Sequence, residues 1–112
     1  MKAVIAFLVA LFISVGAQAQ LATSFVCKDP APYFNAEQVY KSEGNQGAVT
    51  YMNMSVATGQ CLVLPVPVPV EVVHEVGTIN VDGDQIVVVH VRNAAGGEGY
   101  ALVSPKNLPG NL

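Results

Sequence analysis

The sequence lacks tryptophan and carries little charge. Charged residues make up 12% of the 112 residues, with 5 Lys and Arg against 8 Asp and Glu and a net charge of −3. A protein that binds nucleic acid through its phosphates needs a basic surface, and this composition provides none. Hydrophobic residues reach 52%, which is too many for a disordered chain. The composition therefore predicts one small folded domain that does not bind nucleic acid.

Motifs for catalysis and for metal binding are missing too. No serine lies in a G-x-S-x-G or S-x-x-K setting, the two arrangements that most often activate a serine nucleophile. Asp82-Gly83-Asp84 lacks the ligand spacing and the terminal Glu of a calcium loop, and is better interpreted as a turn. The basic residues are scattered along the chain. The sequence thus predicts a protein that is not an enzyme and that has no metal or cofactor.

The first 19 residues have the layout of a secretory signal peptide. Lys2 supplies a positive charge, Ala3–Val15 is an apolar run, and small residues stand at Ala17 and Ala19. This pattern predicts cleavage before Gln20. An uncleaved membrane anchor is the alternative, but a span needs about 20 apolar residues and polar residues end this run early. We therefore expect a periplasmic or secreted protein with no stable membrane span after cleavage.

The mature part holds two cysteines, Cys27 and Cys61. In an oxidising compartment such a pair predicts one disulfide bond. Closing the intervening loop would stabilise the fold by about 3.8 kcal/mol in the chain-entropy model. A redox or metal-binding pair is the alternative, but it is disfavoured because the spacing is not C-x-x-C and no histidine lies near either cysteine in the sequence.

Residues 20–48 are expected to form an N-terminal segment with one short helix. The helix is predicted over Asn35–Lys41, with Asn35 as its N-cap and apolar residues at i, i+3 and i+4 on one face. The polar run Ser42–Gly47, which contains two glycines, predicts a loop that ends the helix. The sequence leaves open whether this segment docks on the rest of the chain.

Residues 49–112 are expected to form a small β-barrel domain. Val49–Val56 is rich in β-branched and aromatic residues, and Asp82-Gly83 between two apolar runs is a strong hairpin signal. A glycine-rich turn then precedes a last strand at Tyr100–Val103, and Ser104–Leu108 is expected to close the domain as a single helical turn. Short strands without alternating helices predict an all-β fold.

Prolines alternate with valines over Pro65–Val70. Alternate residues of a strand direct their N–H groups to the same side, so these prolines remove donors from one edge only. The pattern predicts an edge strand that cannot recruit another strand, and a polyproline-type ligand is the alternative.

The two histidines lie on either side of the predicted hairpin. A register that is symmetric about Asp82-Gly83 would place His90 opposite Glu75 and His74 opposite Val91. We interpret the expected His90–Glu75 pair as a solvated pair on the sheet surface. A pH sensor or general base is the alternative, but a general base also needs a nucleophile or a substrate pocket.

Two short segments carry a resemblance to a known family. Residues 52–55 read Met-Asn-Met-Ser, and Gly99–Val103 is followed by Pro105–Leu108. On these segments the run 52–108 resembles the bacterial Src-homology-3-like domain family. Those domains open with an apolar-Asn-apolar-Arg-Ser stretch and close with Gly-Trp-Val and a turn that ends in Leu. The Arg is missing here, and Tyr100 stands where the family usually has Trp.

The resemblance implies a small Src-homology-3-like barrel that binds a cell-wall component, either peptidoglycan or a peptide, or an envelope protein. It implies Tyr51, Tyr100 and Asn107 as ligand-binding residues. We therefore expect a secreted, non-enzymatic binding or accessory module of the bacterial envelope. The alternative is a small secreted protein inhibitor of an envelope or host enzyme, with the loop Asn93–Glu98 as its protruding contact. The sequence leaves the oligomeric state open.

Overall fold

The computed structural model describes residues 14–15 and 21–108. The predicted cleavage site of the signal peptide, with Ala17 and Ala19, lies outside the described residues. The elements follow in the order β1 (Ser14–Val15), β2 (Leu21–Cys27), α2 (Ala31–Ala57), β3 (Cys61–Val81), β4 (Asp84–Arg92), β5 (Glu98–Val103) and a 3-10 helix η1 (Pro105–Asn107). The fold is mainly β, as predicted, but the long α2 means that it is not all-β.

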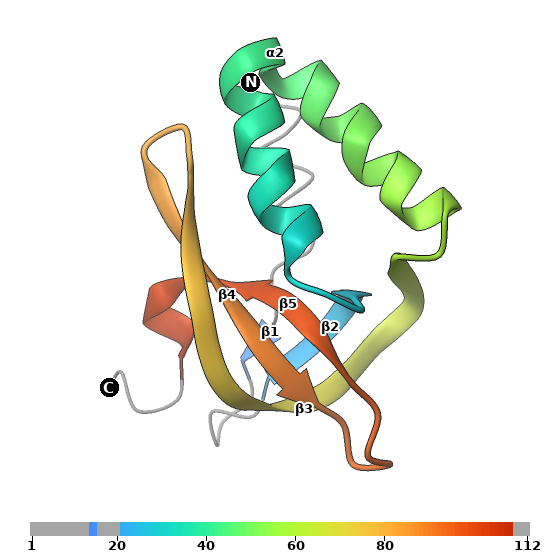
Figure 1. Cartoon of the computed structure of the whole chain (residues 1–112). Helices are drawn as coiled ribbons and strands as arrows, with labels where there is room; N and C mark the ends of the chain where they lie inside the picture. Colours follow the sequence, from blue (N-terminus) through green and yellow to red (C-terminus); the bar gives the residue numbers. More distant parts are fainter. Residues whose placement is uncertain (1–13, 16–20, 109–112) are drawn as a thin grey trace.

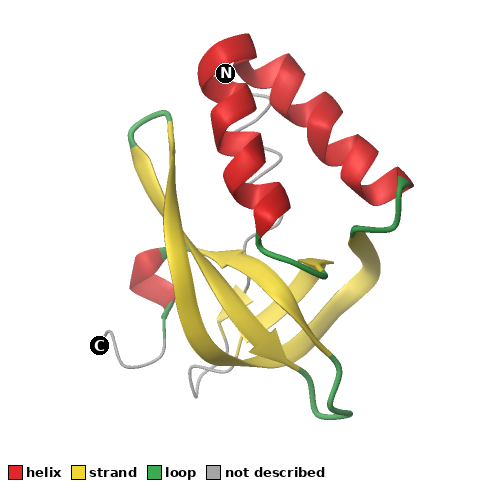
Figure 2. Cartoon of the chain, viewed as in Figure 1, coloured by secondary structure: helices red, strands yellow, loops and turns green. Residues whose placement is uncertain are grey.

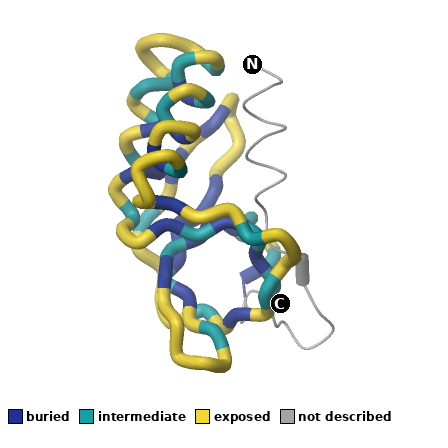
Figure 3. Tube along the Cα trace, turned by 90° about the vertical axis from the view of Figure 1, so that its right-hand side faces the viewer, coloured by how far each residue is buried: buried dark blue, intermediate teal, exposed yellow. Residues whose placement is uncertain are grey.

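The strands form one antiparallel sheet in the order β1-β2-β3-β4-β5. Strand β2 also pairs with β5 through Cys27 and Tyr100, so the two sides of the sheet meet. The long β3 makes this possible because it pairs with β2 up to Val70 and with β4 from Glu71 onwards. The order β2-β3-β4-β5 together with the β2–β5 pairing closes a ring, and a ring is visible in the Cα trace seen from the side (Figure 3).

Within the described residues, the segment 61–70 of β3 has β2 as its only strand partner. The alternating prolines fall in this segment, and Pro69 lies opposite Ala22 of β2. The other side of the segment is an open edge, which confirms the edge-strand interpretation. Proline is tolerated at such an edge because the missing N–H would have no strand to bond.

Two apolar cores lie on opposite faces of the sheet. Val87, Val89 and Val91 of β4 belong to the core inside the ring, whereas Ile86 and Val88 belong to the core beneath α2. Successive residues of a strand point to opposite faces, so β4 is buried on both. This double burial explains why the strand is an almost unbroken run of valines instead of an alternation of apolar and polar residues.

Helix α2 consists of two arms, residues 31–43 and 45–57, which meet at Gly44 (Figures 1 and 2). Gly44 has φ 80° and ψ −170°, a conformation that is essentially restricted to glycine. The arms therefore form an inverted V above the sheet. A tyrosine, a glutamate and a phenylalanine of the first arm fix it to the β3–β4 hairpin.

Three contacts join the first arm to this hairpin. The backbone N–H of Asn80 donates to Oε2 of Glu37 at 2.7 Å, and the Tyr40 hydroxyl donates to Oδ1 of Asp82 at 3.4 Å. Gly77 allows the Phe34 ring to pack directly on β3, since a Cβ at this glycine would lie 2.9 Å from Cζ of the ring. The position of the arm thus depends on a glycine in the strand.

Gly44→Ala is expected to lower the free energy of unfolding by about 1–3 kcal/mol, because alanine is strained at this φ and ψ. An added Cβ would meet no atom within 4 Å, so the cost is one of backbone conformation and not of steric clash. Urea denaturation followed by circular dichroism measures it. The exposed Gln46→Ala is the control, and an equal, small effect of both substitutions would contradict the role of Gly44.

The structure differs from the sequence predictions for residues 42–56. The short helix predicted at Asn35–Lys41 lies within the first arm, but Asn35 is not its N-cap, because the helix already begins at Ala31 with Pro30 as the N-cap. The loop predicted at Ser42–Gly47 is limited to the kink at Gly44. The strand predicted at Val49–Val56 is wrong, since these residues form the second arm. Ala48, Met52 and Ser55 are buried at the helical spacing i, i+4, i+7, and this packing outweighs the β propensity of their neighbours. The opening motif of the family resemblance, residues 52–55, is helical as well.

The predictions for the chain from Asp82 onwards are confirmed in more detail. Asp82 and Gly83 both have positive φ, at 56° and 87°, as a two-residue type I′ hairpin turn requires. The glycine-rich turn, the last strand and the closing helical turn η1 also lie where the sequence predicts them.

Candidate functional site

The predicted disulfide joins Cys27 at the end of β2 to Cys61 at the start of β3, and both cysteines are buried. They are directly opposite each other in the β2–β3 ladder, with Cα atoms 3.9 Å apart. The adjacent pair is joined by the backbone bond from Lys28 N–H to the Gln60 carbonyl, at 2.8 Å. The cysteines thus occupy the non-hydrogen-bonded position, where side chains of opposite strands come closest.

The disulfide closes a loop of the chain that contains the whole of α2, because the helix lies between Cys27 and Cys61 in the sequence. Next to the disulfide, at the open end of the V, lies a cleft of about 720 Å³. Its walls come from the segment that leads into the first arm and from the end of the second arm. The residues that carry its chemistry are Lys28, Asp29, Phe34, Asn35, Tyr51 and Gln60. Every residue that lines the cleft lies between Cys27 and Cys61 in the sequence.

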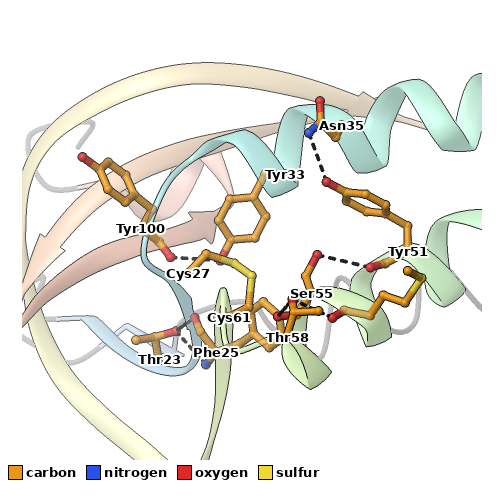
Figure 4. Close-up of a disulfide and its surroundings, with 11 residues drawn as sticks. Thr23, Phe25, Cys27, Tyr33, Asn35, Tyr51, Ser55, Thr58, Cys61 and Tyr100 are labelled. Carbon is orange, nitrogen blue, oxygen red and sulfur yellow. Dashed lines mark hydrogen bonds between the residues drawn. A yellow bond between two sulfur atoms is a disulfide. The ribbon is translucent and has the colours of Figure 1, made fainter.

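A hydrogen bond crosses between the two walls. Nδ2 of Asn35 on the first arm donates to the Tyr51 hydroxyl on the second arm at 3.0 Å (Figure 4). This bond uses the amide N–H of Asn35 and an oxygen lone pair of Tyr51. The Asn35 carbonyl oxygen remains available as an acceptor and the Tyr51 O–H as a donor. The cleft can therefore offer both kinds of hydrogen bond to a ligand.

Tyr33 lies between two lining residues of the cleft, Pro32 and Phe34, but is itself buried beneath the first arm. The ring is buried against Phe25, with ring centroids 6.3 Å apart, and the hydroxyl donates to the backbone carbonyl of Tyr100 at 2.9 Å (Figure 4). Burial raises the pKa of the Tyr33 hydroxyl far above its ordinary value. Tyr33 therefore stays protonated as a donor, and it connects the first arm to the strand that closes the ring.

Tyr33→Phe is expected to cost about 1–2 kcal/mol of stability at neutral pH, the value of a buried hydrogen bond. The raised pKa means that, as the pH increases above about 10, the unfolded chain loses this proton while the folded protein keeps it. The wild type therefore loses stability relative to Tyr33→Phe, by about 1.4 kcal/mol per pH unit. Urea denaturation at pH 8 and pH 11 tests this, and a pH-independent difference between the two proteins would contradict it.

The residues implied by the family resemblance do not form one site. Tyr51 lines the cleft. Tyr100 lies on β5, where its ring stacks on His90 with centroids 5.0 Å apart. Asn107 is at the end of η1, next to Leu108, which packs in the core inside the ring. Only Tyr51 is thus part of the cleft, and the roles of Tyr100 and Asn107 stay predictions.

The predicted pairing of His90 with Glu75 is wrong. The β3–β4 ladder shifts register between Glu75 and Gly77, so that His90 lies opposite His74. The one extra residue of β3 at this irregularity displaces the histidines from the symmetric register, and a second shift, between Val72 and His74, lies beyond them. His90 instead contacts Glu98 of β5, with Nε2 at 2.7 Å from Oε1.

Phe34, Asn35 and Gln60 were not identified from the sequence as site residues. From the sequence, Asn35 is predicted to cap a helix, and nothing shows that the chain folds back at Gly44 to bring Asn35 to Tyr51. The same fold brings Gln60 into the cleft as the neighbour of Cys61. One feature of the sequence nevertheless points to these residues as a group, since all of them lie between Cys27 and Cys61.

The described residues include no group of three or more His, Cys, Asp or Glu side chains that could hold a metal ion. In the same part of the chain, no helix is long and apolar enough to span a membrane. Comparison with protein-family models, with curated proteins and with solved structures finds no match.

Proposed function

We propose that this protein is a secreted, non-enzymatic binding module of the bacterial envelope, and that the cleft beside the disulfide is its ligand site. The single observation that carries the proposal is the composition of the cleft. Aromatic rings, amides and two unlike charges line one concave surface of about 720 Å³, within the range usual for small-ligand sites. No nucleophile with an adjacent base lies among its lining residues, which favours binding over catalysis.

Two further features support an extracytoplasmic location and a barrel scaffold. A disulfide bond between buried cysteines is typical of secreted and periplasmic proteins. The pairing of β2 with β5 supports the proposal of a small barrel of the Src-homology-3-like kind. In this interpretation the strands form a rigid support, and the helical insertion between β2 and β3 provides the binding surface.

Peptidoglycan is the ligand we propose to test first. The purified protein is expected to co-sediment with isolated peptidoglycan sacculi in a saturable manner. Tyr51→Ala is expected to weaken this binding by about tenfold or more, because aromatic anchors in a pocket contribute much of the energy of an interface.

Met54→Ala is the matched control. Met54 lies on the same arm as Tyr51, is 60% exposed and does not line the cleft, so this substitution should leave the binding unchanged. Absence of wild-type binding at moderate salt would contradict peptidoglycan as the ligand. Equal weakening by both substitutions would contradict the location of the site.

A protein inhibitor is the second candidate, and one observation favours it. The loop between β4 and β5 is held rigid by Asn93, whose Oδ1 accepts hydrogen bonds from the backbone N–H groups of Ala95 at 3.0 Å and Gly97 at 2.8 Å. Residues 94–98 are exposed, and the loop protrudes from the end of the sheet (Figure 1). A preorganised loop suits insertion into a partner. Capture of an envelope enzyme that is abolished by Asn93→Ala but not by Tyr51→Ala would favour this function.

A further inference from the structure

We infer that the ligand of the cleft is zwitterionic, a short peptide with an amine and a carboxylate that are both free. The inference rests on the proposed function, since it assumes that the cleft binds a ligand, and it adds the chemical class of that ligand. The residues that carry it are Lys28 and Asp29, which are consecutive in the sequence and both line the cleft.

Neither of these two charges is neutralised within the described part of the protein. Both side chains are exposed, and neither forms an ion pair there. The ion pairs of the described residues lie elsewhere, and they are Lys41–Glu37, Arg92–Glu71 and His90–Glu98. Lys28 and Asp29 are therefore available to a ligand.

The backbone that carries the two charges is fixed in place. Lys28 donates its backbone N–H to the carbonyl of Gln60, another lining residue, and Cys27 is covalently bound to Cys61. Asp29 is followed by Pro30, whose ring fixes φ and whose carbonyl accepts from the Tyr33 N–H at 3.1 Å. The charges thus project from an ordered corner, and binding does not require the backbone to become ordered first.

Adjacent charges of opposite sign discriminate against ligands of a single sign. An anion attracted by Lys28 is repelled by Asp29, and the reverse holds for a cation. A ligand with both charges satisfies both residues, a carboxylate against the Lys28 ammonium and an ammonium against the Asp29 carboxylate. Hydrogen bonds between ionised partners are roughly twice as strong as neutral ones. The pair therefore selects a zwitterion.

The rest of the cleft matches a peptide group. The Asn35 carbonyl oxygen can accept from a ligand N–H and the Tyr51 hydroxyl can donate to a ligand carbonyl, the two bonds that a peptide group requires. Ala31, Pro32 and Phe34 contribute apolar surface for a small side chain. A neutral sugar could use the same amide and hydroxyl, but it would leave both charges without a partner.

The test is calorimetric titration of the disulfide-bonded protein with the tripeptide L-Ala-γ-D-Glu-L-Lys, which carries free amines and free carboxylates. The same peptide with its charged groups acetylated and amidated is the second probe, and the N-acetylglucosamine tetramer is the third. We expect the free tripeptide alone to bind, and to displace the protein from sacculi. Lys28→Gln and Asp29→Asn are each expected to weaken tripeptide binding by about tenfold. The controls Lys106→Gln and Asp84→Asn make the same charge changes outside the cleft and should have no effect.

The outcomes separate this inference from the function on which it rests. If the protein binds sacculi but the glycan tetramer or the capped peptide binds as well as the free tripeptide, the zwitterionic ligand is wrong and the proposed function stands. If the protein binds neither sacculi nor any probe, the proposed function fails and the inference fails with it. Equal effects of the cleft and control substitutions would also overturn the inference.

Discussion

The double substitution Cys27→Ser/Cys61→Ser is expected to lower the free energy of unfolding by about 4 kcal/mol. The two cysteines are 34 positions apart, and the bond between them restricts the unfolded chain over the whole length of α2. A domain of this size has a total stability of about 5–15 kcal/mol, so the loss is a large fraction of it. Urea denaturation followed by far-ultraviolet circular dichroism measures the change, since the chain has no tryptophan to report by fluorescence.

Reduction of the wild type with a dithiol provides the matched control for this substitution. The reduced wild type and the double variant should unfold at similar urea concentrations, both well below the oxidised protein. A loss of less than about 1 kcal/mol would show that the disulfide adds little to the β2–β3 pairing. Two free thiols, detected by alkylation and intact mass in protein taken from the cell envelope, would contradict the presence of the bond.

Phe25→Ala is expected to lower the free energy of unfolding by about 3–5 kcal/mol, the usual cost of removing a large buried ring. Phe25 lies on β2, is 1% exposed and belongs to the core between the sheet and α2. Its ring also contacts Tyr33 of the first arm. The substitution would leave a cavity at the contact between the two layers, and thermal or urea denaturation measures the effect.

Leu62→Ala is the control for Phe25→Ala. Leu62 is opposite Val26, the neighbour of Phe25 on β2, but it is 57% exposed on the edge segment of β3. We expect its substitution to cost well under 1 kcal/mol. Similar costs for the two variants would mean that the core between α2 and the sheet is not the main source of stability.

Local signals in the sequence predicted the second half of the chain well. The Asp82-Gly83 turn is specified by two residues that accept positive φ, and its prediction needs no information from distant parts of the chain. The disulfide could be predicted because the sequence contains two cysteines and so offers one pairing. Pro65–Val70 was recognised as an edge because proline excludes strand pairing on one side wherever the segment lies.

Local signals do not predict the helical insertion. Val49, Thr50, Tyr51 and Val56 have β propensity, and the polar run before them resembles a loop. The helix of the second arm is stabilised by the burial of Ala48 and Met52 against the sheet, a tertiary contact that local propensity does not contain. The predicted register of His74 and His90 was wrong for a related reason, because the irregularities in β3 leave no clear mark in the sequence.

The candidate site could not be predicted either, because this helical insertion forms it. The family resemblance implies Tyr51 as a binding residue, but its place in the cleft results from the turn at Gly44, which brings it within hydrogen-bond distance of Asn35. The resemblance implies Tyr100 as well, yet Tyr100 lies on the strand that closes the ring. A contact between the two arms of α2, such as the Asn35–Tyr51 hydrogen bond, cannot be predicted from the sequence when the second arm is interpreted as a strand.

An NMR titration of the isotopically labelled, disulfide-bonded protein with soluble peptidoglycan fragments tests most directly whether a ligand binds in the cleft within the disulfide loop. We expect the amide signals of residues 28–35 and 51–60 to shift together and to saturate, while those of β4 and of η1 stay in place. Shifts centred on Tyr100 and Asn107, or on the loop between β4 and β5, would contradict binding in the cleft and place it elsewhere on the protein.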